Sequence, residues 1–306
     1  MIGRVVAHVL GVPYVNVCSG HDRVPSRVEA GYRTDPRVSV SSACHEAIRV
    51  LREVHGLDDV THLSWVSGVS PHLNVYGEPP AFLSDEGREA FAPLVYYGNL
   101  SVGRERLAPE DNPWGEQQSG RRRVLVCFGS VGWRLFHADT RMALEAVTEA
   151  LAQRDDVEGL VAFGLDELDD DIKRAYTRPN VRVEAWVDQW AALEGADAFV
   201  THAGLNSVHE AVYHRVPMVA YPLFADQPSL ARICTSLGIA VSLTDEVRAP
   251  VAPADVHRAL DALVANRDRM ARQLDVVREW ELEVIAGRPD AARRIAQLAT
   301  GRRVAG

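Results

Sequence analysis

The sequence of 306 residues is poor in positive charge and has almost no lysine. Lys173 is the only lysine among 33 basic residues, and 42 acidic residues bring the net charge to −9. A chain with this balance is poorly suited to nucleic acids and to anionic membrane surfaces, so we expect neither partner. We interpret the preference for arginine as a sign of GC-rich coding sequence.

The sequence also lacks the patterns of metal sites, disulfide frameworks and membrane spans. Its 4 cysteines have no Cys-x-x-Cys spacing, and its 11 histidines form no His-Glu-x-x-His motif. We therefore expect reduced thiols, no protein-bound metal and no cofactor. No apolar run reaches the ~18–20 residues that span a bilayer, and no signal peptide is evident, which predicts a cytoplasmic protein.

The second half of the chain alternates short apolar runs with helical patterns. The apolar runs lie at 124–128, 159–163, 181–184, 198–201, 217–221 and 239–243, and helices are expected at 138–153, 206–214 and 228–237. This alternation predicts a parallel, doubly wound sheet of the α/β class, whose ligands bind beyond the carboxyl ends of the strands. Polar or aromatic clusters fall at such ends, at 129–130, 186–189, 202–210 and 226–227.

The first part of the chain is less regular. Residues 3–20 are typical of the end of a helix followed by a strand, and 290–299 form a C-terminal helix. The stretch 104–121 is polar and rich in proline and glycine, which indicates an interdomain linker. We therefore expect two domains, at 1–103 and 122–306.

The most informative stretch is 201–227, with the sequence THAGLNSVHEAVYHRVPMVAYPLFADQ. Ala203 and Gly204 allow a tight turn after a strand, and Asn206 and Ser207 lie where a helix begins. The N-terminus of a helix presents unpaired backbone N–H groups and the positive end of its dipole, which suits a phosphate group. The segment therefore predicts a strand–turn–helix phosphate site that has neither the Walker nor the GxGxxG pattern.

With these residues in place, the chain resembles GT-B glycosyltransferases of the UDP-glycosyltransferase family, which includes macrolide and flavonoid glycosyltransferases. The motifs that carry the resemblance are FGSVG (128–132), WVDQW (186–190), THAGLNSVHEAV (201–212) and VPMVAYPLFADQ (216–227). The resemblance is dense from 122 to 243 and thinner from 1 to 100. It implies a GT-B-like α/β fold of two Rossmann-like domains, in which the N-terminal, acceptor-binding domain is incomplete and the C-terminal domain binds a nucleotide sugar.

The resemblance implies a role for each residue of the base and ribose site. Trp186 would stack on the nucleotide base, and the backbone of Val187 would read the edge of that base. Gln189 and Glu210 would hydrogen-bond the ribose hydroxyls, for which a carboxylate is a suitable acceptor.

The same resemblance implies a site for the diphosphate and the sugar. The residues that would hold the two phosphates are Ser130, His202, Gly204, Asn206 and Ser207. Asp226 and Gln227 would face the hydroxyls of the donor sugar. Because the diphosphate is the leaving group, donors aimed at it stabilise charge that grows in the transition state. No metal is required if His202 and the helix N-terminus supply that stabilisation.

The implied reaction transfers a hexose or deoxyhexose from a UDP- or dTDP-sugar to a hydroxyl of a small apolar acceptor, with inversion. A secondary metabolite, such as an antibiotic precursor, fits the family as acceptor. The transfer needs a general base, which in this family is a histidine near the start of the N-terminal domain. This chain opens at 2–13 in what resembles a later helix, so we expect roughly a hundred residues of a usual domain to be absent. The catalytic residues stay unassigned.

Three explanations stay open for the missing base. The first, which we favour, is that the chain is a fragment of a longer reading frame. The second is that a second copy or a partner chain completes the N-terminal sheet. The third is a non-catalytic nucleotide-sugar-binding subunit. A further alternative, a sugar-nucleotide epimerase of the same fold, is disfavoured. It would need acidic residues in the cleft in place of the sugar contact at 226–227, and the sequence does not show them. His21 and Asp22 follow a strand, and we interpret them as a polar surface loop rather than as a substitute base.

Three positions depart from the family pattern. Ala203 and Arg215 replace glycines that are usual in the family, and Asp188 stands where proline is common. An alanine in the turn is tolerable if its φ angle is negative, so we expect the first departure to be mild.

Overall fold

A computed structural model describes residues 2–35, 39–64, 68–100, 113–115 and 120–300. The chain divides into two compact units, the first formed by 1–98 and 282–306 and the second by 99–281. Most of the predicted linker, at 104–112 and 116–119, lies outside the described residues.

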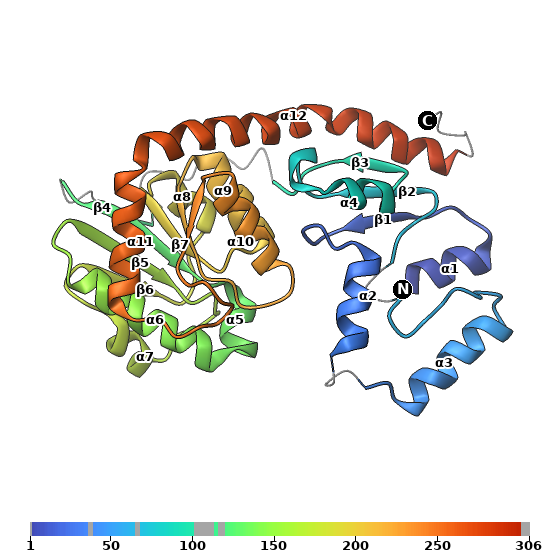
Figure 1. Ribbon diagram of the computed structural model, residues 1–306, viewed down its shortest axis with the longest axis horizontal. Helices are drawn as coiled ribbons and strands as arrows, with labels where there is room; N and C mark the ends of the chain where they lie inside the picture. The colour runs from blue at the N-terminus through green and yellow to red at the C-terminus, as the bar shows by residue number, and fades with distance from the viewer. Residues whose placement is uncertain (1, 36–38, 65–67, 101–112, 116–119, 301–306) are drawn as a thin grey trace. The chain divides into compact units, whose positions relative to one another are not determined.

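The second unit is built on a six-stranded sheet with the strand order β6-β5-β4-β7-β8-β9 (Figure 1). Its strands are β4 (Arg122–Cys127), β5 (Val157–Ala162), β6 (Val181–Glu184), β7 (Ala198–Thr201), β8 (Met218–Ala220) and β9 (Ala240–Ser242). All neighbouring strands pair in parallel. The predicted doubly wound sheet is therefore confirmed. Its strand order reverses between β4 and β7, where such sheets bind ligands.

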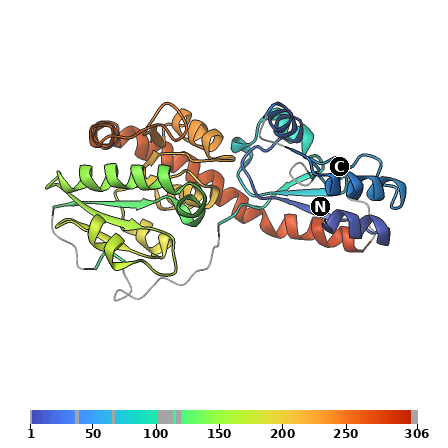
Figure 2. The same ribbon diagram turned by 90° about the horizontal axis from the view of Figure 1, so that it is seen from below.

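Helices follow the strands of the second unit and cover both faces of its sheet (Figure 2). They are α5 (Gly129–Leu135), α6 (His137–Ala152), α7 (Asp170–Tyr176), α8 (Gln189–Glu194), α9 (Leu205–His214), α10 (Gln227–Ser236) and α11 (Pro253–Ala265). The core is aliphatic at its centre, where Val126, Val161 and Val200 on three adjacent strands are fully buried. Continuous burial on both faces explains why these strands read as unbroken apolar runs.

The first unit has a smaller sheet with the order β1-β2-β3, in which both pairs are parallel. The strands are β1 (Val15–Cys18), β2 (Leu73–Tyr76) and β3 (Leu94–Tyr96), and the helices are α1 (Ile2–Leu10), α2 (Pro25–Thr34), α3 (Ser42–Glu53), the short 3₁₀ helix η1 (Pro80–Phe82) and α4 (Asp85–Ala90). Aliphatic side chains of β2 and β3 pack on Ala291 and Ile295 of the last helix.

That last helix, α12 (Arg267–Ala299), belongs to both units, because the division between them falls after Glu281. It is 33 residues long and contains Pro289, so it extends well beyond the predicted helix at 290–299.

Candidate functional site

The polar clusters singled out in the sequence lie at one edge of the second sheet. Ser130 follows β4, Trp186 follows β6, His202 follows β7 and Asp226 follows β8. The strands are parallel and in register at their ends, as in the pairing of Cys127 with Thr201. Their carboxyl ends therefore meet at one edge, and the loops that carry these residues lie together there.

The imidazole of His202 lies in a space that two glycines leave open. A Cβ atom at Gly204 would overlap its Nε2 atom, and one at Gly129 would lie 2.9 Å from its Cε1 and Nε2 atoms. Desolvation lowers the pKa of His202 to about 4, and the carbonyl of Cys127 opposes this shift only in part. The ring is therefore neutral at neutral pH and carries one N–H donor.

The turn between β7 and α9 is left-handed at Ala203, where φ is 56°. The expectation that alanine is a mild departure here assumed a negative φ, and it is wrong. A non-glycine residue in this region costs roughly 1–2 kcal/mol. Arg215 caps the C-terminus of α9 at φ 60°, a conformation that also favours glycine. The third departure has a structural reason, since Asp188 caps α8 by accepting a hydrogen bond from the Ala191 N–H at 3.3 Å.

Helices α8 and α9 bring three of the predicted residues into one hydrogen-bonded group. The Nε2 atom of Gln189 donates to Oε2 of Glu210 at 2.7 Å and to Oγ of Ser207 at 3.2 Å. Gln189 is the first residue of α8, whereas Ser207 lies in the first turn of α9. The structure thus places the two predicted ribose residues beside one predicted phosphate residue.

Two predicted residues at this edge are strongly exposed. The Trp186 side chain is 65% exposed beyond the end of β6, and Ser130 is exposed in the first turn of α5. Val187, next to Trp186, is half-buried. A solvent-exposed indole presents a flat apolar face to ligands.

The two residues predicted to face the sugar have different surroundings. Gln227 is 5% exposed, and its Oε1 atom accepts hydrogen bonds from the N–H groups of Leu223 and Phe224 at 2.9 and 3.1 Å. Its side chain thereby fixes the loop after β8, so a sugar contact would fall to its NH₂ group. Asp226 is half-buried and lies at the N-cap position of α10.

Sequence reasoning missed Asn99, which lies at the same edge. Its Nδ2 atom donates to Oδ1 of Asn206 at 3.0 Å. The two residues are 107 positions apart in the chain, so no local spacing could have joined them.

The interpretation of His21 as part of a polar surface loop is wrong. His21 is 4% exposed, and its Nδ1 atom lies 3.0 Å from Oε2 of Glu78, which is 1% exposed. The hydroxyl of Tyr76 donates to the same carboxylate oxygen at 2.8 Å. Asp22 is held beside them, because its N–H donates to the Tyr76 hydroxyl at 2.8 Å. These residues form a buried polar cluster within the first unit.

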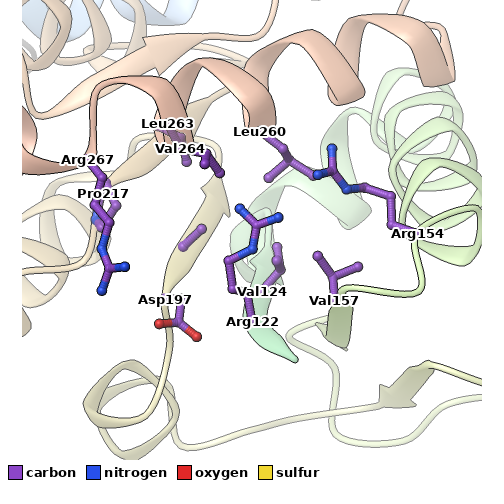
Figure 3. Close-up of a pocket in the computed structure, with 11 residues that line it drawn as sticks. Arg122, Val124, Arg154, Val157, Asp197, Pro217, Leu260, Leu263, Val264 and Arg267 are labelled. Carbon is purple, nitrogen blue, oxygen red and sulfur yellow. The ribbon is translucent and has the colours of Figure 1, made fainter. Parts of the chain in front are cut away.

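A cavity in the second unit lies at the opposite edge of the sheet, near the amino ends of β4, β5 and β7 (Figure 3). Its wall combines apolar residues of α11 with the side chains of Arg122 and Arg154. Both arginines pair with Asp156, and Arg154 also pairs with Asp261. The cavity is therefore separate from the residues described above, and two of its positive charges are already neutralised.

Within the described ranges, no group of three or more His, Cys, Asp or Glu side chains could hold a metal ion. None of the helices described is long and apolar enough to cross a membrane. The cysteines, all of which are described, are free thiols.

More than half of the chain matches the sequence model of a known protein family. The sequence model of the family described as "UDP-glucoronosyl and UDP-glucosyl transferase" matches residues 90–273. The UDP-glucuronosyltransferase 2B17 of Rattus norvegicus is 32% identical over 173 residues, which are 56% of this chain and 30% of the rat protein. The chain thus spans less than a third of that relative's length.

Solved structures show the same fold. The glycotransferase of kitacinnamycin has a TM-score of 0.72 and 22% identity, with 95% of this chain and 73% of that chain covered. The glycosyltransferase VinC, solved in complex with dTDP, has a TM-score of 0.65 and 15% identity, with 96% and 69% covered. The predicted GT-B-like fold is therefore confirmed.

Proposed function

This chain belongs to the family of UDP-glucoronosyl and UDP-glucosyl transferases, and we propose that it transfers a hexose or deoxyhexose from a UDP- or dTDP-sugar to a hydroxyl group. The observation that carries the proposal is the convergence of His202, the N-terminus of α9 and the Gln189–Glu210 pair at the carboxyl edge of one parallel sheet. The family match favours a transferase over a binding subunit without activity.

The diphosphate of the donor would lie at the N-terminus of α9. The first N–H groups of a helix have no partner within it and attract anions. In α9 these belong to Leu205, Asn206 and Ser207, because the first bond within the helix runs from the Val208 N–H to Gly204. His202, held neutral by desolvation, would add one N–H donor without the cost of burying a charge.

These donors would also serve the chemical step. When the glycosidic bond to the diphosphate breaks, negative charge grows on the leaving oxygen. Preorganised N–H groups that already point there lower the barrier without reorganisation. We therefore propose that departure of the diphosphate needs no metal, and that adding a chelator leaves the transfer rate unchanged.

Recognition of the nucleoside would fall to α8 and the loop before it. The exposed indole of Trp186 offers a stacking surface for the base, and the Val187 backbone would read the edge of the base. The Glu210 carboxylate would accept hydrogen bonds from the ribose, oriented by the 2.7 Å contact from Gln189. Asp226, and Gln227 through its NH₂ group, would face the sugar.

The finer parts of the proposal rest on the family resemblance. They are a small apolar acceptor such as a secondary metabolite, inversion at the anomeric carbon, and action in the cytoplasm. The general base is not assigned to any residue described above.

We also propose that a second copy or a partner chain covers the open edge of the first sheet. Among the described residues, β1 pairs with β2 alone, and Val17 on β1 is 68% exposed. An unpaired edge strand with an exposed apolar side chain favours association. Light scattering of the purified chain tests the second copy: the mass of a single chain at all concentrations would contradict it and leave the partner chain as the proposal.

The sugar-binding part of the proposal can be tested with one substitution. Replacing Asp226 by Ala removes a carboxylate at the sugar end and leaves α9 unchanged. We expect unchanged affinity for UDP and dTDP and a weaker affinity for the matching nucleotide sugar, both measured by calorimetry. Equal losses for nucleotide and nucleotide sugar would mean that Asp226 only maintains the loop.

A further inference from the structure

In the structure, the amide oxygen of Asn206 is turned toward Asn99. A side-chain amide has an accepting oxygen at one end and a donating NH₂ group at the other. The oxygen of Asn206 accepts the hydrogen bond from Asn99 at 3.0 Å. The NH₂ group of Asn206 is the end that this bond leaves for a ligand.

The orientation matters because Asn206 is the second residue of α9, where a diphosphate would bind. A diphosphate attracts an N–H donor and repels a carbonyl oxygen. With the amide turned around, Asn206 would present its oxygen to the phosphates and weaken the anion site. A free asparagine on an exposed turn has no strong preference between the two orientations, so a second group must select one.

The surroundings of Asn99 suit this role. Asn99 is half-buried, as expected of a residue that supports another, whereas Asn206 is exposed. The Oδ1 atom of Asn99 is buried and has no hydrogen-bond partner in the part of the chain that is described. Unpaired buried polar atoms are rare in folded proteins and require a specific reason. Among the described residues, the NH₂ end of Asn99 is the end with a partner, and that partner is Asn206.

We propose that Asn99 is a positioning residue of the donor site, which turns the NH₂ group of Asn206 toward the diphosphate. The inference rests on the proposed function, since it assumes a nucleoside diphosphate at the N-terminus of α9. Asn99 acts through Asn206 and touches neither the base nor the ribose.

The test compares ligands that differ only in their phosphates. Binding of UDP is measured by calorimetry, and binding of uridine by saturation-transfer NMR, for the wild type and for Asn99→Ala. Loss of the orienting bond should raise the dissociation constant of UDP by about 3- to 10-fold, the range for one hydrogen bond. The affinity for uridine should stay unchanged. A variant that only disturbs the fold would lose both ligands in parallel.

A second variant reverses the amide. In Asn99→Asp, the new carboxylate can only accept, so Asn206 would turn its NH₂ group toward position 99 and its oxygen toward the phosphates. We expect a larger loss of UDP affinity than in Asn99→Ala, about 10- to 100-fold, because an acceptor and an added negative charge face the diphosphate. A loss no larger than that of Asn99→Ala would count against the orienting role.

A double-mutant cycle shows whether Asn99 acts through Asn206. In an Asn206→Ala background, Asn99→Ala should have no further effect on UDP binding. Additive losses would overturn the inference, as would unchanged UDP affinity in both Asn99 variants of a wild type that binds UDP. A folded wild type that binds neither UDP nor dTDP would overturn the proposed function and this inference with it, which separates the two failures.

Discussion

Beyond the carboxyl ends of the strands, two candidate site residues of the second unit are exposed, whereas the polar cluster of the first unit is buried. In the second unit, Trp186 is 65% exposed and Ser130 lies at the surface. In the first unit, His21 and Glu78 are 4% and 1% exposed and pair with each other. Polar groups that satisfy one another in the interior stabilise a fold, whereas groups kept at the surface of a helix N-terminus are available to a ligand. The same edge of a parallel sheet thus serves structure in one unit and, in our proposal, binding in the other.

The largest effect should come from breaking the buried cluster of the first unit. Glu78→Ala leaves His21 and the Tyr76 hydroxyl without their shared acceptor. Removing one partner of a buried pair costs about 3–5 kcal/mol, so we expect a loss of that order in the free energy of unfolding, measured by urea denaturation. The control is Glu86→Ala, since Glu86 pairs with Arg27 at the surface and its loss should cost less than about 1 kcal/mol. UDP affinity should be unchanged in both variants. A loss of UDP affinity in Glu78→Ala, but not in Glu86→Ala, would show that the buried cluster of the first unit also affects nucleotide binding.

The second largest effect should come from filling the space around His202. In Gly204→Ala the new methyl group would overlap the Nε2 atom, so the ring must move away from the N-terminus of α9. We expect UDP affinity to fall by about 1–3 kcal/mol, the range for losing a charge-assisted hydrogen bond. Gly287→Ala is the matched control, because a Cβ at Gly287 meets nothing within 4 Å. Calorimetry that gave equal affinities for the two variants would show that the ring does not contact the ligand.

The depressed pKa of His202 predicts how stability depends on pH. Its pKa is about 4 in the folded chain and 6.5 in the reference state, so the unfolded chain binds the proton more readily. Stability should therefore be constant above pH 6.5 with respect to this group and fall as the pH drops toward 4. His202→Gln should lose less stability than the wild type over that interval, as measured by urea denaturation at several pH values. Identical pH profiles would contradict desolvation of the ring.

The smallest effect should come from restoring glycine at the strained positions. Ala203→Gly and Arg215→Gly each relieve a positive φ, and we expect each to stabilise the second unit by about 0.5–1 kcal/mol. Arg215 pairs with Asp275 at the surface at 2.6 Å, so its gain should be the smaller of the two. Thermal unfolding measures both. Destabilisation by Ala203→Gly would show that packing of the buried methyl group stabilises the fold more than the positive φ of Ala203 destabilises it.

The sequence predicted the second sheet well for a physical reason. Strands such as β4 and β7 are buried on both faces, so they appear as short runs of apolar residues between helical patterns. The extent of α12 was not predictable in this way. The predicted helix started at 290, whereas the helix continues through Pro289, a residue that usually interrupts a helix interior.

Side-chain contacts between distant segments account for most of what the sequence could not predict. The pairs His21–Glu78 and Asn99–Asn206 join residues 57 and 107 positions apart, and no local pattern brings such residues together. The left-handed turn at Ala203 was missed because alanine normally avoids that conformation. The Oε1 atom of Gln227 accepts hydrogen bonds from two N–H groups of the loop before it. These bonds depend on the shape of that loop, which the sequence pattern does not give.

The most direct test of the account is calorimetric titration of the chain with UDP and dTDP, for the wild type and for His202→Ala. The matched control is His257→Ala, a change on α11, which lies outside the candidate site. We predict that the wild type and the control bind at least one nucleotide, and that His202→Ala binds it more weakly by about 1–3 kcal/mol. If the folded wild type bound neither nucleotide, or if His202→Ala bound as tightly as the control, the edge of the second sheet would not be a nucleotide-sugar site of the kind proposed.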